Sequence, residues 1–222
     1  MPKKIFLNGL EDTFYLLLSE KLRSLGGKIV DSNSNSDISV GMGINSTGSV
    51  RIIPANQDFE TQEGSIIVIH DLIIPNGGNY WGGREIRTII QSIINNHKIT
   101  PTNKINYWVN IRDVVSVIST IIMGKKEDFG ILPLCGRRGW SDSDIISETD
   151  ILWSRYNNSI NYSHTTESLA NIPSPVRNTE QILDNRPNLK PLHDCIISCG
   201  GQGWHPVESM RTSIMELIAE IY

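Results

Sequence analysis

The chain has 222 residues, enough to bury a sizeable core in one large domain, with or without a small appendage. Its formal net charge of -4, with both signs mixed along the chain, excludes the basic footprint of a nucleic-acid-binding protein. No apolar run reaches the roughly 18 residues of a membrane span, and the first residues lack a signal-peptide pattern. Three cysteines, an odd number, suit a reducing compartment, so we expect a cytoplasmic protein without membrane or nucleic-acid partners.

The chain opens with the pattern strand, glycine, helix, strand. An apolar run over 3–8, bounded by Gly9, predicts a buried strand. Asp12 stands at the N-cap position of a helix over 12–25, in which apolar residues recur at helical spacing. A glycine pair ends that helix, and a second strand begins at 28–30.

Three more strand candidates follow with no room for helices between them, at 38–42, 50–53 and 65–74. Neighbouring parallel strands usually need a crossover of about a dozen or more residues. We therefore expect hairpins, or a much reduced sheet, between residues 38 and 74. The topology of 32–64 stays open.

The second half alternates helices with strands. The predicted helices are 84–96, 113–124, 141–156 and 206–222, and the predicted strands are 105–110 and 129–136. Such alternation predicts an α/β protein with a largely parallel, reduced Rossmann-like sheet. We divide the chain into a reduced Rossmann-like half, 1–75, and a part, 76–222, that carries the remaining Rossmann elements and a smaller C-terminal α/β region of the substrate-binding type. Both form one compact unit.

Four segments occur in a recognisable order. They are IIVIHDLIIPNGG (66–78), YWVNIRDVVSVISTIIMG (107–124), ILPLCGRRGWSDSDIISE (131–148) and GWHPVESMRTSIMELIAEIY (203–222). Together they resemble the extended short-chain dehydrogenase/reductase family of nucleotide-sugar epimerases, dehydratases and reductases. Asp113 matches the second acid of the strand-Asp-Asp-helix junction of that family, whereas Arg112 replaces the first. The resemblance covers residues 3–31 and 65–222.

The resemblance implies NAD(P)-dependent chemistry, but two of its requirements are missing. The family uses a Tyr-x-x-x-Lys pair as acid/base, and none of the six tyrosines has a lysine four residues later. In the glycine motif only Gly9 is retained, with Asp12 and Tyr15 at the other two positions. Gly9 and Asp31 are thus the degenerate remains of a cofactor site, and we expect no NAD(P) binding in the ordinary mode.

Two groups are candidates for ligand binding. Tyr80 and Trp81 lie in the glycine-rich segment NGGNYWGGRE and offer flat surfaces for a base or a sugar. Arg137 and Arg138, which follow a strand and a glycine, could hold a phosphate. The alternatives are aromatic side chains that cap the core or meet a partner subunit, and arginines that are simply solvated.

The remaining reactive residues give weaker signals. His70 and Asp71 at a strand end, together with Tyr80, are candidates for relocated acid/base catalysis, although such residues often only satisfy backbone groups. His193, Cys195, Cys199 and His205 match no compact zinc motif, and we expect no metal site.

Three functions remain open at this point. The first is a degenerate, non-catalytic relative, active in polysaccharide biosynthesis, that binds a nucleotide-sugar-like ligand or a partner protein. The second is an active NAD(P)-dependent nucleotide-sugar epimerase, dehydratase or reductase with relocated catalytic residues. The third is a structural or assembly subunit. It would form homo- or hetero-oligomers through a surface other than the usual dimer helix, which this chain lacks.

Overall fold

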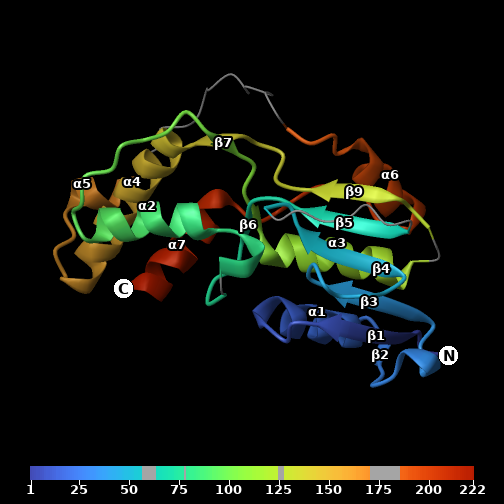
Figure 1. Cartoon of the computed structure of the whole chain (residues 1–222). Helices are drawn as coiled ribbons and strands as arrows, with labels where there is room; N and C mark the ends of the chain where they lie inside the picture. The colour runs from blue at the N-terminus through green and yellow to red at the C-terminus, as the bar shows by residue number, and fades with distance from the viewer. Residues whose placement is uncertain (57–63, 78, 125–127, 171–185) are drawn as a thin grey trace.

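The computed structural model describes residues 1–56, 64–77, 79–124, 128–170 and 186–222. Its central feature is one parallel sheet of six strands in the order β2-β1-β3-β4-β5-β9 (Figure 1). These strands are β1 (Lys4–Gly9), β2 (Lys28–Ile29), β3 (Ile38–Met42), β4 (Val50–Pro54), β5 (Ser65–Ile69) and β9 (Ile131–Leu134). Every pairing between them is parallel, which confirms the α/β class.

Helices cover one face of the sheet and continue beyond its edge. They are α1 (Thr13–Ser24), α2 (Arg84–Ile94), α3 (Ile111–Met123), α4 (Asp142–Ile160), α5 (Thr166–Leu169), α6 (Lys190–Ser198) and α7 (Met210–Ile221). Two small sheets join β6 (Leu72–Ile73) to β8 (Val109–Asn110), and β7 (Ile105–Asn106) to β10 (Trp140–Ser141). In the described part of the chain, no helix is long and apolar enough to cross a membrane.

The expectation of hairpins or a much reduced sheet between residues 38 and 74 is wrong, because β3, β4 and β5 pair in parallel. The connection 43–49 has seven residues, which can span about 25 Å and so return along a five-residue strand of about 17 Å. It lies directly against β3, since a Cβ on Gly48 would be 2.6 Å from the backbone N of Gly41. A helix is therefore not needed here. In the next connection, residues 57–63 lie outside the described residues. By the resemblance, the helix of the Tyr-x-x-x-Lys pair would fall over 50–64, and the first five of these residues form β4.

Two predicted strands are interrupted. The predicted strand 65–74 breaks at His70 and Asp71, where Asp71 adopts a left-handed backbone conformation with φ 49°. The strand predicted over 105–110 is divided into β7 and β8, which belong to different sheets. A hydrogen bond holds both breaks together, because Tyr107 N–H donates to the Asp71 carboxylate at 2.6 Å.

Helix boundaries follow their caps. Asp12 caps α1 as predicted, and Ser141 caps α4 in a capping box. The last helix begins at Met210 and not near Pro206, because residues 207 and 208 donate their N–H groups to Asp113 and not to a helical turn. The sequence did not predict α6, which begins with a proline at an early position, contains Cys195 and ends before Cys199.

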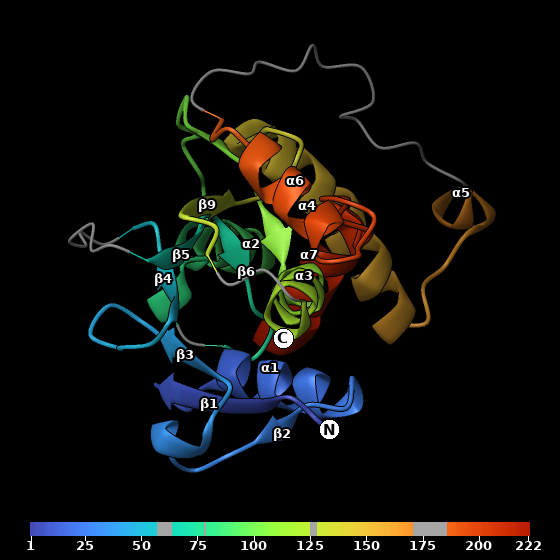
Figure 2. The ribbon, with the colours of Figure 1, turned by 90° about the vertical axis from the view of Figure 1, so that its right-hand side faces the viewer.

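The buried residues form two main clusters. One face of the sheet packs on α1, α3 and α6, which Figure 2 shows on the same side of the strands. The other cluster joins α2, α4 and α7, with Trp108 and Trp140 between them and the sheet. A smaller group on the opposite sheet face consists of Ile53, Ile66 and Val68. Each cavity described below lies at or beyond the carboxyl ends of the strands.

Candidate functional site

The N-terminus of α1 is occupied by side chains of the protein itself. Asp12 accepts a hydrogen bond from Tyr15 N–H at 3.0 Å through one carboxylate oxygen. Its other oxygen accepts from the indole N–H of Trp81 at 2.6 Å. Trp81 is only 2% exposed and packs edge-on against the ring of Phe14, with centroids 4.9 Å apart.

Tyr80 extends this arrangement to the next strand. Its ring packs edge-on against Trp81, and its hydroxyl accepts a hydrogen bond from Ile44 N–H at 3.0 Å, just beyond β3. The short helix η2 (Asn79–Trp81) therefore lies across the carboxyl ends of β1 and β3. This is the crevice in which Rossmann folds bind dinucleotides.

Gly9 has a packing role in this crevice. With φ 140°, it lies so close to β3 that a Cβ would be 2.1 Å from the carbonyl oxygen of Met42. Asp31 is exposed after β2, on the rim of the sheet. Of the three positions of the glycine motif, 9, 12 and 15, only the first is a glycine.

The residues at α1 do not fit a dinucleotide pyrophosphate. A phosphate would have to replace the Asp12 carboxylate at the first-turn N–H groups and displace the Trp81 indole. Two like charges about 4 Å apart repel by about 1 kcal/mol in water and by more where they are partly buried. We therefore derive no reaction step through such a cofactor.

His70 and Asp71 lie at the end of β5 and line a cavity of about 470 Å³ together with Trp81. Burial lowers the pKa of His70, although the nearby Asp71 acts in the opposite direction. Burial also raises the pKa of Asp71, opposed by its bond from Tyr107 N–H. Across the cavity, Lys104 forms an ion pair with Glu85 at 2.7 Å. A neutral imidazole beside a carboxyl group could exchange protons with a bound ligand.

A second cavity, of about 370 Å³, contains the arginines. Its wall includes Arg137, Arg138 and Arg186. The Arg138 guanidinium lies over the Trp140 ring, 4.7 Å from its centroid, and Arg186 donates to the carbonyl of Arg137 at 3.2 Å. Arg137 is 3.3 Å from Nδ1 of His205. No ion pair within the described part of the chain involves Arg137 or Arg186.

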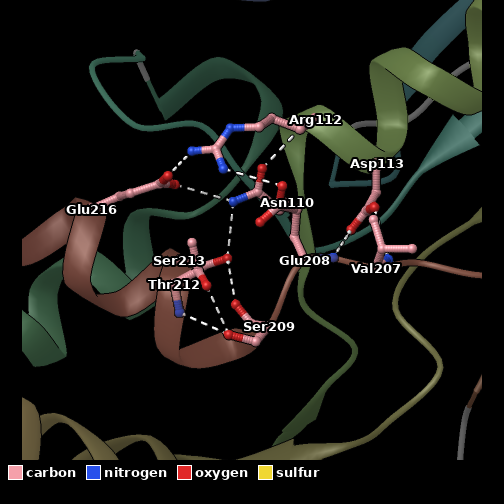
Figure 3. Close-up of polar contacts among 9 residues, drawn as sticks. All are labelled: Asn110, Arg112, Asp113, Val207, Glu208, Ser209, Thr212, Ser213 and Glu216. Carbon is pink, nitrogen blue, oxygen red and sulfur yellow. Dashed lines mark hydrogen bonds and ion pairs between the residues drawn. The ribbon is translucent and has the colours of Figure 1, made fainter.

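The acidic residues of this second cavity are already engaged. Asp113 is 6% exposed, and its two oxygens accept the N–H groups of Val207 and Glu208 at 2.9 and 3.1 Å (Figure 3). Burial raises the pKa of Asp113, against the effect of these bonds. Glu208 pairs with Arg112 at 3.2 Å. The wall of this cavity thus carries three arginines, Arg137, Arg138 and Arg186, against the two carboxylates, so its net charge is positive.

A polar network fixes the start of α3 against α7 and so shapes the arginine cavity (Figure 3). Asn110 accepts Arg112 N–H at 2.9 Å and donates to Ser213 at 3.0 Å and to Glu216 at 3.2 Å. Arg112 also forms an ion pair with Glu216. The position at which Arg112 replaces the acid of the resembling family thus connects two helices.

The structure separates the residues singled out in the sequence into two places. Tyr80, Trp81 and Gly9 meet at the β1–β3 crevice, and Trp81 also lines the cavity of His70 and Asp71, whereas Arg137 and Arg138 belong to the other cavity. The described residues contain no cluster of His, Cys, Asp or Glu that could hold a metal ion.

Sequence reasoning missed Trp108, which lines both cavities. It belongs to YWVN, a segment whose pattern predicts only a strand. The sole available signal was the presence of a large aromatic residue with a polar N–H in a segment expected to be buried.

Comparison with solved structures places this geometry among known folds. RMD from Pseudomonas aeruginosa, complexed with NADPH, matches with a TM-score of 0.59 and 10% identity over 100% of this chain and 98% of that one. A UDP-glucuronic acid 4-epimerase mutant from Bacillus cereus, bound to a fluorinated UDP-glucuronic acid and NAD, matches with a TM-score of 0.56 and 10% identity over 98% of both chains. The Bordetella bronchiseptica enzyme WbmF, in complex with NADH, matches with a TM-score of 0.53 and 8% identity over 98% of this chain and 91% of that one.

These likenesses show the fold. It is a Rossmann-like fold, as the order of the sequence motifs predicted. No protein-family model and no curated protein sequence matches the chain.

Proposed function

We propose that this protein binds a nucleotide-sugar-like ligand in the arginine-lined cavity and does not catalyse hydride transfer. One observation carries the proposal. The crevice for a dinucleotide is filled by Asp12 and Trp81, whereas Arg137 and Arg186 line a cavity and form no ion pair within the described part of the chain.

The lining of the arginine cavity suits a nucleoside diphosphate attached to a sugar. Guanidinium groups bind phosphate oxygens through paired, charge-assisted hydrogen bonds. Trp108 and Trp140 add aromatic surface against which a base or sugar ring can pack. The Bacillus cereus epimerase, which shares the fold, is named as a complex with a UDP-sugar.

An active enzyme is the second candidate, because His70 and Asp71 share a cavity next to the arginine site. In that case the protein would turn over a nucleotide sugar with added NAD(P), and His70→Gln would remove the activity. Absence of product with UDP- and GDP-sugars, at enzyme concentrations at which binding is saturated, would exclude this candidate.

The binding test is a thermal-shift and calorimetry panel with UDP-glucose, GDP-mannose, UDP, NAD⁺, NADH and NADPH. We expect a nucleotide sugar to raise the Tm, since a ligand at 100 times its Kd stabilises the folded state by about 2.7 kcal/mol. The dinucleotides should leave the Tm unchanged. Replacing Arg137 and Arg186 by alanine should abolish the shift, and Arg23→Ala on the exposed face of α1 serves as the matched control.

Two outcomes would contradict the proposal. One is micromolar binding of NAD(H) or NADPH to the unmodified protein. The other is failure of every nucleotide and nucleotide sugar to bind.

A further inference from the structure

Trp108 has a buried hydrogen-bond donor that is not used. Its side chain is 7% exposed, and its indole N–H has no hydrogen-bond partner among the residues that the structure describes. Two other tryptophans of the chain behave differently. Trp81 donates to Asp12 at 2.6 Å, and Trp204 donates to the carbonyl of Cys135 at 2.9 Å.

Such a donor is unusual, because buried indole N–H groups normally find an acceptor. An indole N–H that is buried without an acceptor loses its hydrogen bond to water and gains no other hydrogen bond. An unused donor of this kind is often completed by a molecule that is not part of the chain. Whether a bound molecule can complete the donor of Trp108 depends on where this side chain lies.

Trp108 stands between the two cavities. It belongs to the wall of the arginine cavity and also to the wall of the cavity that contains His70 and Asp71. The flanking strands β7 and β8 hold its backbone, and Gly136 lies close against it, since a Cβ there would be 2.2 Å from the Trp108 carbonyl oxygen. A ligand that fills either cavity therefore lies against this ring. The indole N–H itself is not exposed to the empty cavities, so a ligand oxygen reaches it when the ring shifts on binding.

We propose that the indole N–H of Trp108 recognises an oxygen of the ligand whose anionic group is bound by Arg137 and Arg186. This inference rests on the proposed function and adds a requirement to it. The ligand must carry a hydrogen-bond acceptor at the wall between the two cavities, and a phosphate oxygen or a sugar hydroxyl supplies one. Trp108 is in this sense a residue that determines specificity.

The test compares Trp108→Phe with Trp204→Phe, two variants that lose the same atoms. Trp108→Phe should weaken the binding of UDP-glucose about tenfold or more. Because the donor that it removes has no partner inside the protein, Trp108→Phe should lower the Tm of the free protein less than Trp204→Phe does. Trp204→Phe breaks a bond inside the protein and is compared by its Tm alone, because Trp204 lies beside Arg137 and Arg186 in a neighbouring cavity. Trp153→Phe, in α4 and in the wall of neither cavity, is the control that should leave the affinity unchanged. UDP is measured in parallel. If Trp108→Phe binds both ligands more weakly, the acceptor is a phosphate oxygen. If it binds only UDP-glucose more weakly, the acceptor is a sugar hydroxyl.

A second readout does not depend on the stability of the variants. With ¹⁵N-labelled tryptophan, the indole resonance of Trp108 should move downfield when UDP-glucose is added, as a hydrogen bond forms. Equal affinity of Trp108→Phe and the unmodified protein would overturn the inference and leave the proposed function intact, as would an unmoved resonance with the ligand bound. Absence of all nucleotide binding by the unmodified protein would overturn both.

Discussion

Asp12 uses both of its carboxylate oxygens inside the molecule, one for the cap of α1 and one for Trp81. Asp12→Ala should therefore lower the free energy of unfolding by about 2–4 kcal/mol, the sum of a lost cap of about 1 and an orphaned buried indole of about 1–3. Urea unfolding followed by tryptophan fluorescence measures the change. The adjacent, exposed Glu11→Ala is the control and should change stability by less than about 0.5 kcal/mol. Equal losses for the two variants would contradict the role given to Asp12.

His70 gives a prediction for pH. Burial lowers its pKa below the ordinary 6.5, so the folded state binds a proton at this site less readily than the unfolded state does. The stability contributed by neutral His70 is present above about pH 6.5 and is lost as the pH falls below it. We expect His70→Gln to flatten the fall in unfolding free energy between roughly pH 7 and pH 5. Parallel pH profiles for the two proteins would show that the site is not desolvated.

At this scale the sequence predicted the residues that act locally. Asp12 as an N-cap depends only on neighbours along the chain. The contact between Trp81 and Asp12 joins residues 69 positions apart. No local pattern encodes it. The sequence left two roles open for Trp81, a stacking surface for a ligand or a side chain that caps the core or meets a partner, and the structure buries it.

Between elements, the link from α3 to α7 depends on Asn110. Asn110→Asp keeps the cap on α3 but replaces an amide donor by a second carboxylate opposite Glu216. We expect a loss of about 1–3 kcal/mol in urea unfolding. Adding Glu216→Gln should recover part of that loss, because it removes the like charge, and Glu216→Gln alone completes the cycle. Full stability of Asn110→Asp would mean that the network contributes nothing.

Helices proved easier to predict than strand connections for a physical reason. A helix carries its own hydrogen bonds and caps, so α1, α2, α3 and α4 can be recognised from their sequences. A strand is defined by its partner. Whether 43–49 turns back as a hairpin or returns along β3 depends on contacts such as that of Gly48 with Gly41, which no periodicity reveals.

Over the whole molecule, the order of motifs predicted the fold, and the structural likenesses confirm it at about 10% identity. The candidate site was predicted only in pieces. Arg137 and Arg138 were candidates for holding a phosphate, with solvated arginines as the alternative, and they lie in the wall of a cavity. That Trp108 joins them there could not be foreseen, because it comes from a distant segment of the chain.

The short connection between β3 and β4 also affects the order in which the strands pair during folding. Val40 pairs with Val50 and Val50 with Ser65, only 10 and 15 residues apart along the chain. A usual strand-helix-strand unit has about 30 residues or more, so these strands close smaller loops before they meet. Because folding rates rise as contacts become more local, the middle of this parallel sheet can form early, ahead of the pairing of β9 with β5.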